Sequence, residues 1–73
     1  MEKIEYEFKY KCRLCGEVFG SGYTRNRELV VKEIAMVASG MKPDFCHILF
    51  PHHCNDYDIG LADFIGVRVC TKN

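Results

Sequence analysis

The chain has 73 residues, of which 48% are hydrophobic, and its ten basic and ten acidic side chains give a formal net charge of +0. The balanced charge excludes the broad positive field that drives non-specific nucleic-acid binding. A chain of this length builds one modest core, and such domains often need a metal, a disulfide or a partner for stability. We therefore expect residues 1–73 to form a single domain that has a further source of stability.

The first predicted element is a strand at residues 4–11. Apolar or aromatic side chains alternate there with charged ones, which is the period of two expected of a strand with one buried face. A return strand at residues 17–19 would complete a hairpin. Gly20 and Gly22 are predicted to mark its end.

One helix is predicted after the hairpin. Thr24 or Asn26 would cap its start, the helix would run to Ser39, and Gly40 would stop it. Its apolar members form a broad face that we expect to pack into the core. These members are Val30, Val31, Ile34, Ala35, Val37 and Ala38.

Two further strands are predicted after the helix. Residues 45–50 form an apolar run that indicates a buried strand ended by Pro51, and residues 55–58 have turn composition. Residues 64–69 indicate a last strand that is interrupted by Gly66. The predicted fold class is α+β: a small domain with a β-hairpin, one helix and two further β-strands.

Two short groups of metal-ligating residues are the most informative feature of the chain. Cys12 and Cys15 are separated by two residues, so a tight turn followed by Gly16 would direct both sulfur atoms at one point. His52 and Cys54 are two residues apart, and in an extended segment they point to the same side. The predicted metal ligands are therefore Cys12, Cys15, His52 and Cys54. Three thiolates and one imidazole are typical of structural zinc. The predicted α+β fold is therefore a small zinc-stabilised domain with a zinc-knuckle β-hairpin, one helix and two further β-strands.

Other ligand sets remain open at this point. A turn at the second group would break the strand geometry and put His53 in place of His52. Further sets include Cys46, His47 or Cys70. Both Cys46 and Cys70 lie in apolar runs, so we expect them to be buried thiols.

The sequence also predicts where the chain is found. Its first residues lack the apolar core of a secretory signal, and no segment approaches the ~20 apolar residues of a membrane span. A cytoplasmic location is expected, without a membrane partner. The five cysteines are an odd number, which argues against a scheme of disulfides.

Three segments resemble small uncharacterised zinc-ribbon-like proteins of phages and prophages. The segments are residues 10–19, 52–56 and 59–66. They match a cysteine pair near the start, a His-any-Cys element, and a Gly-any-Ala-Asp-aromatic-Ile-Gly tail, while the middle of the chain has no counterpart. The resemblance implies His52 and Cys54 rather than His53 as ligands, and a phage or mobile-element context. It implies no activity.

We expect a non-catalytic, zinc-stabilised binding module, encoded by a phage or prophage as an accessory protein, that binds a protein partner. Four protein ligands close a tetrahedral zinc and leave no position for an activated water molecule. No other pair of residues forms a recognisable nucleophile and base. The sequence therefore does not predict an enzyme, and zinc is the only cofactor that it predicts.

Two alternatives belong to other classes. A nucleic-acid-binding zinc ribbon would use the basic side chains near the hairpin, which are Lys9, Lys11, Arg13, Arg25 and Arg27. A small His-Asn-His-like nuclease would use His52, His53 and Asn55, but that fold needs a helix after the loop. The residues that follow Asn55 indicate a turn and a strand instead.

Overall fold

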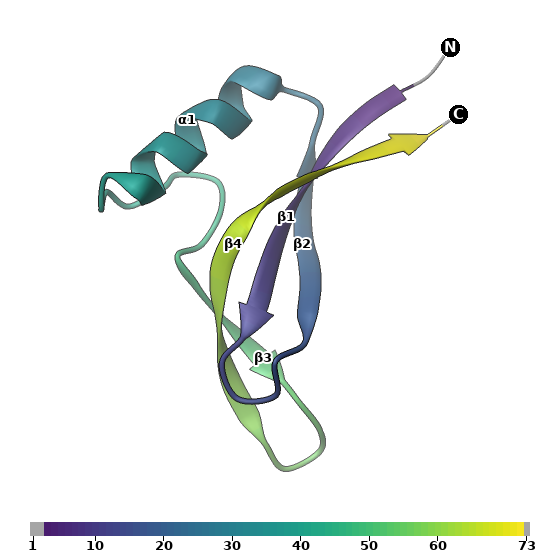
Figure 1. Ribbon diagram of the computed structural model, residues 1–73, viewed down its shortest axis with the longest axis vertical. Helices are drawn as coiled ribbons and strands as arrows, with labels where there is room; N and C mark the ends of the chain where they lie inside the picture. The colour runs from purple at the N-terminus through teal and green to yellow at the C-terminus, as the bar shows by residue number, and fades with distance from the viewer. Residues whose placement is uncertain (1–2, 73) are drawn as a thin grey trace.

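The computed structural model describes residues 3–72. Its elements are β1 (Lys3–Cys12), β2 (Val18–Thr24), α1 (Arg27–Ala38), β3 (Leu49–His53) and β4 (Ile59–Lys72). The four strands form one antiparallel sheet in the order β2-β1-β4-β3 (Figure 1). The predicted α+β class, with one helix, is confirmed.

Strand β1 is central because it pairs with two neighbours. Its alternating pattern places Phe8 and Tyr10 on the buried face, as predicted, and Cys12 follows them there, whereas Ile4 is exposed. Strand β4 pairs with β1 from Ala62 to Lys72, so the last strand is far longer than the predicted segment 64–69. A register shift near Gly66, whose φ is +146°, lets β4 continue past the predicted interruption.

Strand β2 does not end at its glycines, so the prediction that Gly20 and Gly22 mark its end is wrong. It continues to Thr24 beside β1. Gly20 lies against the Glu7 side chain and has no room for a Cβ atom, while Gly22 has a φ of +91°. Both glycines therefore accommodate an irregular pairing within the strand rather than a turn after it.

The predicted limits of α1 are confirmed. Asn26 is the N-cap, and its side chain accepts a hydrogen bond of 3.2 Å from the Leu29 N–H. Thr24 accepts a bond of 3.1 Å from the Asn26 N–H and so orients the cap. The helix ends at Ala38, two residues before Gly40, whose φ of +79° suits a helix stop.

The predicted apolar face of α1 is largely wrong. The residues of that face that lie exposed are Val31, Ile34, Ala35 and Ala38. The helix instead buries Val30 and Glu33, with Val37 half-buried. The face is rotated relative to the prediction because a charged residue, Glu33, occupies its centre.

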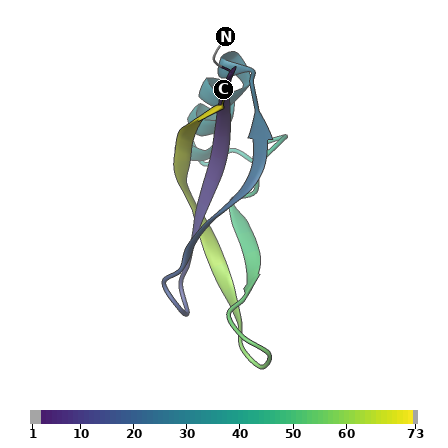
Figure 2. The same ribbon diagram turned by 90° about the vertical axis from the view of Figure 1, so that its right-hand side faces the viewer.

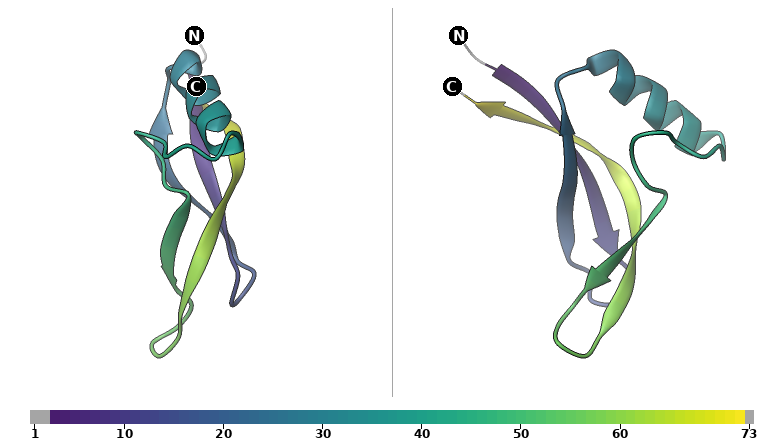
Figure 3. Two further views of the ribbon diagram at one scale, coloured as in Figure 1. Left: turned by 90° about the vertical axis from the view of Figure 1, so that its left-hand side faces the viewer. Right: turned by 180° about the vertical axis from the view of Figure 1, so that it is seen from behind.

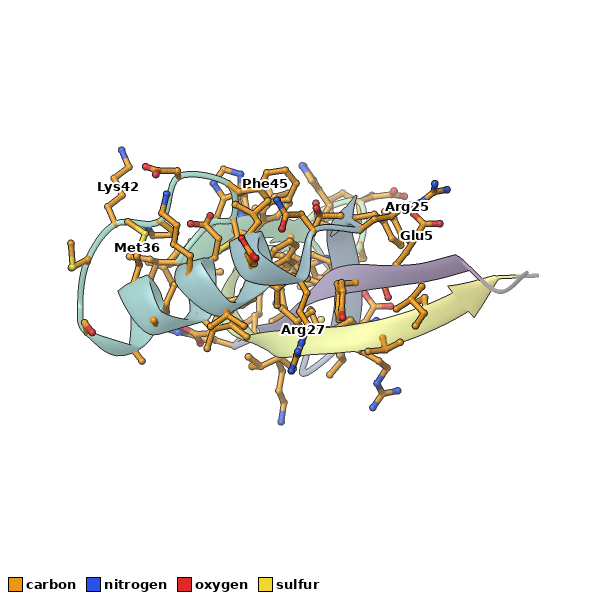
Figure 4. The ribbon with its side chains drawn as sticks, turned by 90° about the horizontal axis from the view of Figure 1, so that it is seen from above. Glu5, Arg25, Arg27, Met36, Lys42 and Phe45 are labelled. Carbon is orange, nitrogen blue, oxygen red and sulfur yellow. The ribbon has the colours of Figure 1, made fainter. Side chains whose placement is uncertain are left out.

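The carboxylate of Glu33 organises the loop after α1. It accepts hydrogen bonds from the backbone N–H groups of Asp44 (3.2 Å), Cys46 (3.0 Å) and Phe45. Burial raises the pKa of the Glu33 carboxyl, but these three bonds outweigh burial and hold the pKa below its ordinary value. The predicted strand 45–50 is therefore wrong at its start, because these N–H groups bond to a side chain and not to a strand. Figure 4 shows Phe45 on the loop that runs beside α1.

Strand β3 begins later than predicted and passes through Pro51, so the prediction that Pro51 ends the strand is also wrong. Pro51 pairs with Leu61 of β4. Because β3 is an edge strand, the missing N–H of proline can face away from the sheet at no cost in ladder hydrogen bonds. The strand therefore extends to His52 and His53.

The core lies on one face of the sheet. Its buried apolar members are Phe8, Tyr10, Cys12, Val30, Cys46 and Ala62. Cys46 is thus buried as predicted, whereas Cys70 is only half-buried. The helix lies at one end of the molecule, and the turns of both hairpins lie at the other (Figure 3). Within residues 3–72, no helix combines the length and apolar character needed to cross a membrane.

Candidate metal centre

The turns of the two hairpins both lie at the end of the molecule opposite α1 (Figure 2). One turn joins β1 to β2, and the other joins β3 to β4. They bring together four side chains whose ligand atoms lie within 4.8 Å of one another: Cys12, Cys15, His52 and Cys54. This is the set predicted from the sequence, and it could hold a metal ion.

The first turn follows from the Cys-any-any-Cys spacing. The Gly16 N–H donates to the Cys12 carbonyl (2.9 Å), and the Cys12 N–H donates to the Glu17 carbonyl (2.9 Å). Gly16 has a φ of +77°, which a residue with a side chain rarely adopts. The turn therefore places Cys15 opposite Cys12 without strain.

The second turn is fixed by an asparagine, as its composition predicts. The Asn55 side-chain oxygen accepts hydrogen bonds from the N–H groups of Tyr57 (2.8 Å) and Asp58 (2.9 Å). The Cys54 N–H donates to the Asp58 carbonyl (2.9 Å). These bonds hold Cys54 at the base of the turn, beside the end of β3.

One pair of sulfur atoms has a separation close to that expected at a tetrahedral zinc site. The Sγ atoms of Cys12 and Cys54 are 3.6 Å apart. Two thiolates bound to one zinc at about 2.3 Å with a tetrahedral angle lie about 3.8 Å apart. A zinc ion would therefore require little movement of this pair.

The thiols affect one another's ionisation. Burial raises the pKa of the Cys54 thiol to about 12, and its contacts with Cys15 and Cys12 act in the same direction. A hydrogen bond from the backbone of Cys15 lowers the pKa of Cys12, against the effect of burial. A divalent metal bound between these sulfur atoms would supply the positive charge that stabilises the thiolate form of a ligating cysteine.

His52 has a buried ring nitrogen, Nε2, that forms no hydrogen bond of good geometry with the described residues. Its ring stacks on Phe19, with centroids 4.7 Å apart. Glu17 Oε2 lies 2.7 Å from His52 Nε2, but it lies off the direction of the ring N–H. Among residues 3–72, this buried nitrogen therefore has no hydrogen-bond partner. A metal ion would satisfy it, since neutral imidazole is a common zinc ligand.

The other candidate ligands lie outside the cluster. His53 is exposed and pairs with Ile59 on the opposite face of the sheet. Cys46 is buried under the loop, and His47 is exposed. The Cys70 sulfur contacts the Glu7 carboxylate at 3.9 Å. The described part of the chain therefore offers one group of clustered ligands.

Gly60 makes room for the sulfur cluster. It is buried and pairs with His52 across β3 and β4. A Cβ atom at this position would lie 2.5 Å from Cys12 Sγ and 3.4 Å from Cys54 Sγ. Any larger residue would therefore displace the sulfur atoms.

An ion pair ties the first turn to β4. Arg13 donates two hydrogen bonds to the Asp63 carboxylate, from Nε (2.7 Å) and from a terminal nitrogen (2.6 Å). Hydrogen bonding to Arg13 holds the pKa of Asp63 below its usual value. The Arg13 N–H also donates to the Leu61 carbonyl (2.8 Å). The turn that carries Cys15 is thus anchored to the strand that follows Cys54.

The sequence analysis missed three supporting residues. Gly60 could have been found, because Gly60 and Ala62 are small residues on one face of a strand, a pattern that indicates close approach. Glu17 and Asp63 carry no comparable signal, because the side chains that their carboxylates approach, His52 and Arg13, are distant along the chain.

Comparison with protein-family models, with curated proteins and with solved structures found no match to this chain. None of them links the chain to phage or prophage proteins. The geometry of the cluster and of the surface is what bears on function.

Proposed function

We propose that this chain is a non-catalytic binding module whose fold is stabilised by one structural zinc ion. The observation that carries the proposal is the meeting of Cys12, Cys15, His52 and Cys54 within 4.8 Å. Three thiolates and an imidazole match zinc, whereas magnesium and calcium prefer oxygen ligands.

A structural role for zinc follows from the number of ligands and their origin. Four protein ligands complete a tetrahedron and leave no position for a reacting water molecule. The ligands come from both hairpins, so one ion would join the two hairpins to each other. The free energy of zinc binding, of order 10 kcal/mol for structural sites, would then contribute to folding.

The surface charge supports a protein partner over a nucleic acid. Of the five basic residues near the hairpin, Lys9 is paired with Glu7 and Arg13 with Asp63. Arg25 and Arg27 extend in different directions (Figure 4). With three thiolates and Zn²⁺ the formal net charge of +0 becomes −1, which disfavours a polyanion. A His-Asn-His-like nuclease needs a helix after the loop that carries Asn55, but strand β4 follows that loop in this chain.

Metal analysis of the purified protein, combined with native mass spectrometry, tests the proposal. We expect one zinc ion per chain, and we expect a strong chelator to remove both the zinc and the circular-dichroism signal of the fold. A well-folded protein that contains no metal would overturn the proposal.

A further inference from the structure

The three cysteines of the metal centre differ in their exposure to solvent. Cys15 is exposed, Cys54 is half-buried and Cys12 is buried. Oxidation of cysteine follows the accessibility of its sulfur atom as well as its thiolate character. A dissolved oxidant therefore meets Cys15 first, at the turn that joins β1 to β2.

Two of the sulfur atoms are close enough to join after a small movement. Cys12 Sγ and Cys54 Sγ are 3.6 Å apart. A disulfide bond is about 2.05 Å long, so the two atoms need to approach by about 1.5 Å. They reach across β4 from opposite sides and meet over Gly60, where a Cβ atom would lie 2.5 Å and 3.4 Å from them. The missing side chain of Gly60 therefore leaves the space in which the sulfur atoms can join.

Hydrogen bonds hold the two turns without any contribution from a metal ion. The backbone N–H groups of Cys12 and Cys54 each donate a bond of 2.9 Å within their own turn. Arg13 donates two hydrogen bonds to Asp63 and so ties the first turn to β4. These contacts keep the two sulfur atoms facing each other at the moment when a metal ion leaves.

The other two cysteines cannot compete for this reaction. Cys46 is buried and lies outside the cluster. Cys70 pairs with Glu5 near the start of β1, whereas Cys12 ends that strand. Roughly 20 Å of strand therefore separates Cys70 from the cluster. A disulfide that forms within the folded chain must use the cysteines of the metal centre.

We propose that the metal centre is also a redox modification site, at which a hydroperoxide oxidises Cys15 and zinc is exchanged for a disulfide bond between Cys12 and Cys54. This inference rests on the structural zinc ion of the proposed function and adds a chemical response to it. A hydroperoxide suits the reaction because it accepts the two electrons that formation of one disulfide releases.

The reaction has three balanced steps. The Cys15 thiolate attacks one oxygen of the hydroperoxide, the O–O bond breaks, and the expelled hydroxide or alkoxide takes a proton from water. The Cys12 thiolate attacks the sulfur of the Cys15 sulfenic acid, forms an S–S bond and expels hydroxide, which also takes a proton. The Cys54 thiolate then attacks the Cys12 sulfur, and Cys15 leaves as a thiolate. Zinc, left with Cys15 and His52, dissociates.

The last exchange is favoured because only its product joins the two hairpins. A bond between Cys12 and Cys15 would lie within one turn. Cys12 and Cys54 are 42 residues apart in the chain, so a bond between them constrains the unfolded chain more strongly. We therefore expect the oxidised, zinc-free protein to stay folded, unlike reduced protein that a chelator has stripped of zinc.

Treatment of the zinc-loaded full chain with one equivalent of hydrogen peroxide, followed by mass spectrometry, tests the proposal. We expect loss of the zinc ion and of two hydrogen atoms, and a disulfide that peptide mapping places between Cys12 and Cys54. The circular-dichroism signal of the fold should remain. A thiol reductant added with zinc should restore the starting protein. A 1,3-diketone that labels sulfenic acids, present during the reaction, should mark Cys15.

Cys70→Ser is the matched control, because Cys70 is half-buried outside the cluster. It should lose zinc at the wild-type rate and form the same disulfide. Zinc-loaded protein that keeps its metal in peroxide, unfolds as it oxidises or forms another disulfide would overturn the proposal. So would a sulfenic-acid label on any cysteine other than Cys15, or slower zinc loss in Cys70→Ser.

Metal analysis before the peroxide is added separates the two proposals. A chain that binds no zinc contradicts the proposed function. A chain that binds zinc but gives the wrong oxidation product contradicts the redox inference alone.

Discussion

Replacing Glu33 by glutamine should destabilise the fold far more than the same change on the surface of the helix. Glu33 is fully buried, and its two oxygens accept three backbone hydrogen bonds from the loop that follows α1. Glutamine has one acceptor oxygen, so its NH₂ group must face at least one backbone N–H. That N–H then loses a charge-assisted bond worth about 1.5–3 kcal/mol.

The net effect is smaller than the sum of the weakened bonds, because the glutamine side chain is neutral and costs less to bury. We expect a loss of about 2 kcal/mol in the free energy of unfolding, or about 10 °C in Tm for a chain of this size. The pKa of Glu33 lies below its ordinary value. A carboxylate with a lowered pKa contributes its full stability above its unfolded pKa and loses it in acid, so the comparison belongs at pH 7.

Thermal unfolding of the zinc-loaded protein, followed by circular dichroism, measures this difference. Glu28→Gln is the matched control, because Glu28 is exposed in the first turn of the same helix. It should shift Tm little. Equal shifts for the two variants would refute the reasoning that the Glu33 carboxylate holds the loop in place.

Three further predictions concern the metal centre. His52→Ala should weaken zinc binding in a chelator competition by more than about 100-fold, which exceeds the usual loss when a residue that only hydrogen-bonds to a ligand is replaced. His53→Ala should change zinc affinity little. Equal losses for the two variants would contradict the assignment of His52 as the ligand. Gly60→Ala should weaken zinc at least about 10-fold because the new methyl group meets the Cys12 sulfur, and Gly40→Ala, remote from the cluster, should lower stability but not zinc affinity. Purified protein with magnesium or manganese should not cleave nucleic acid, peptide or ester substrates, and turnover that disappears in His53→Ala with zinc retained would contradict a non-catalytic module.

The sequence predicted the elements whose signals are local. Alternation from Ile4 to Lys11 indicates β1, the Asn26 cap and Gly40 bound α1, and the asparagine turn at 55–58 is visible in its composition. The spacing within each pair of ligands also depends only on neighbouring residues. The four candidate ligands could therefore be identified from the sequence, whereas their approach to one another in space could not.

The sequence failed where tertiary contacts override local pattern. The apolar run 45–50 has no period that distinguishes a strand from a buried loop, and the carboxylate of Glu33, distant along the chain, decides between them. The same residue rotates the buried face of α1. A proline such as Pro51 predicts the end of a strand, except in an edge strand. Whether β3 is an edge strand depends on the order of all four strands in the sheet.

X-ray absorption spectroscopy at the zinc edge of the purified protein is the most direct test of the central claim, that Cys12, Cys15, His52 and Cys54 bind one zinc ion. Zinc held by three thiolates and one imidazole should show about three sulfur neighbours near 2.3 Å and about one nitrogen near 2.0 Å. His53→Ala should leave this shell unchanged. A shell dominated by oxygen or nitrogen, or one with four sulfur neighbours, would contradict the assignment.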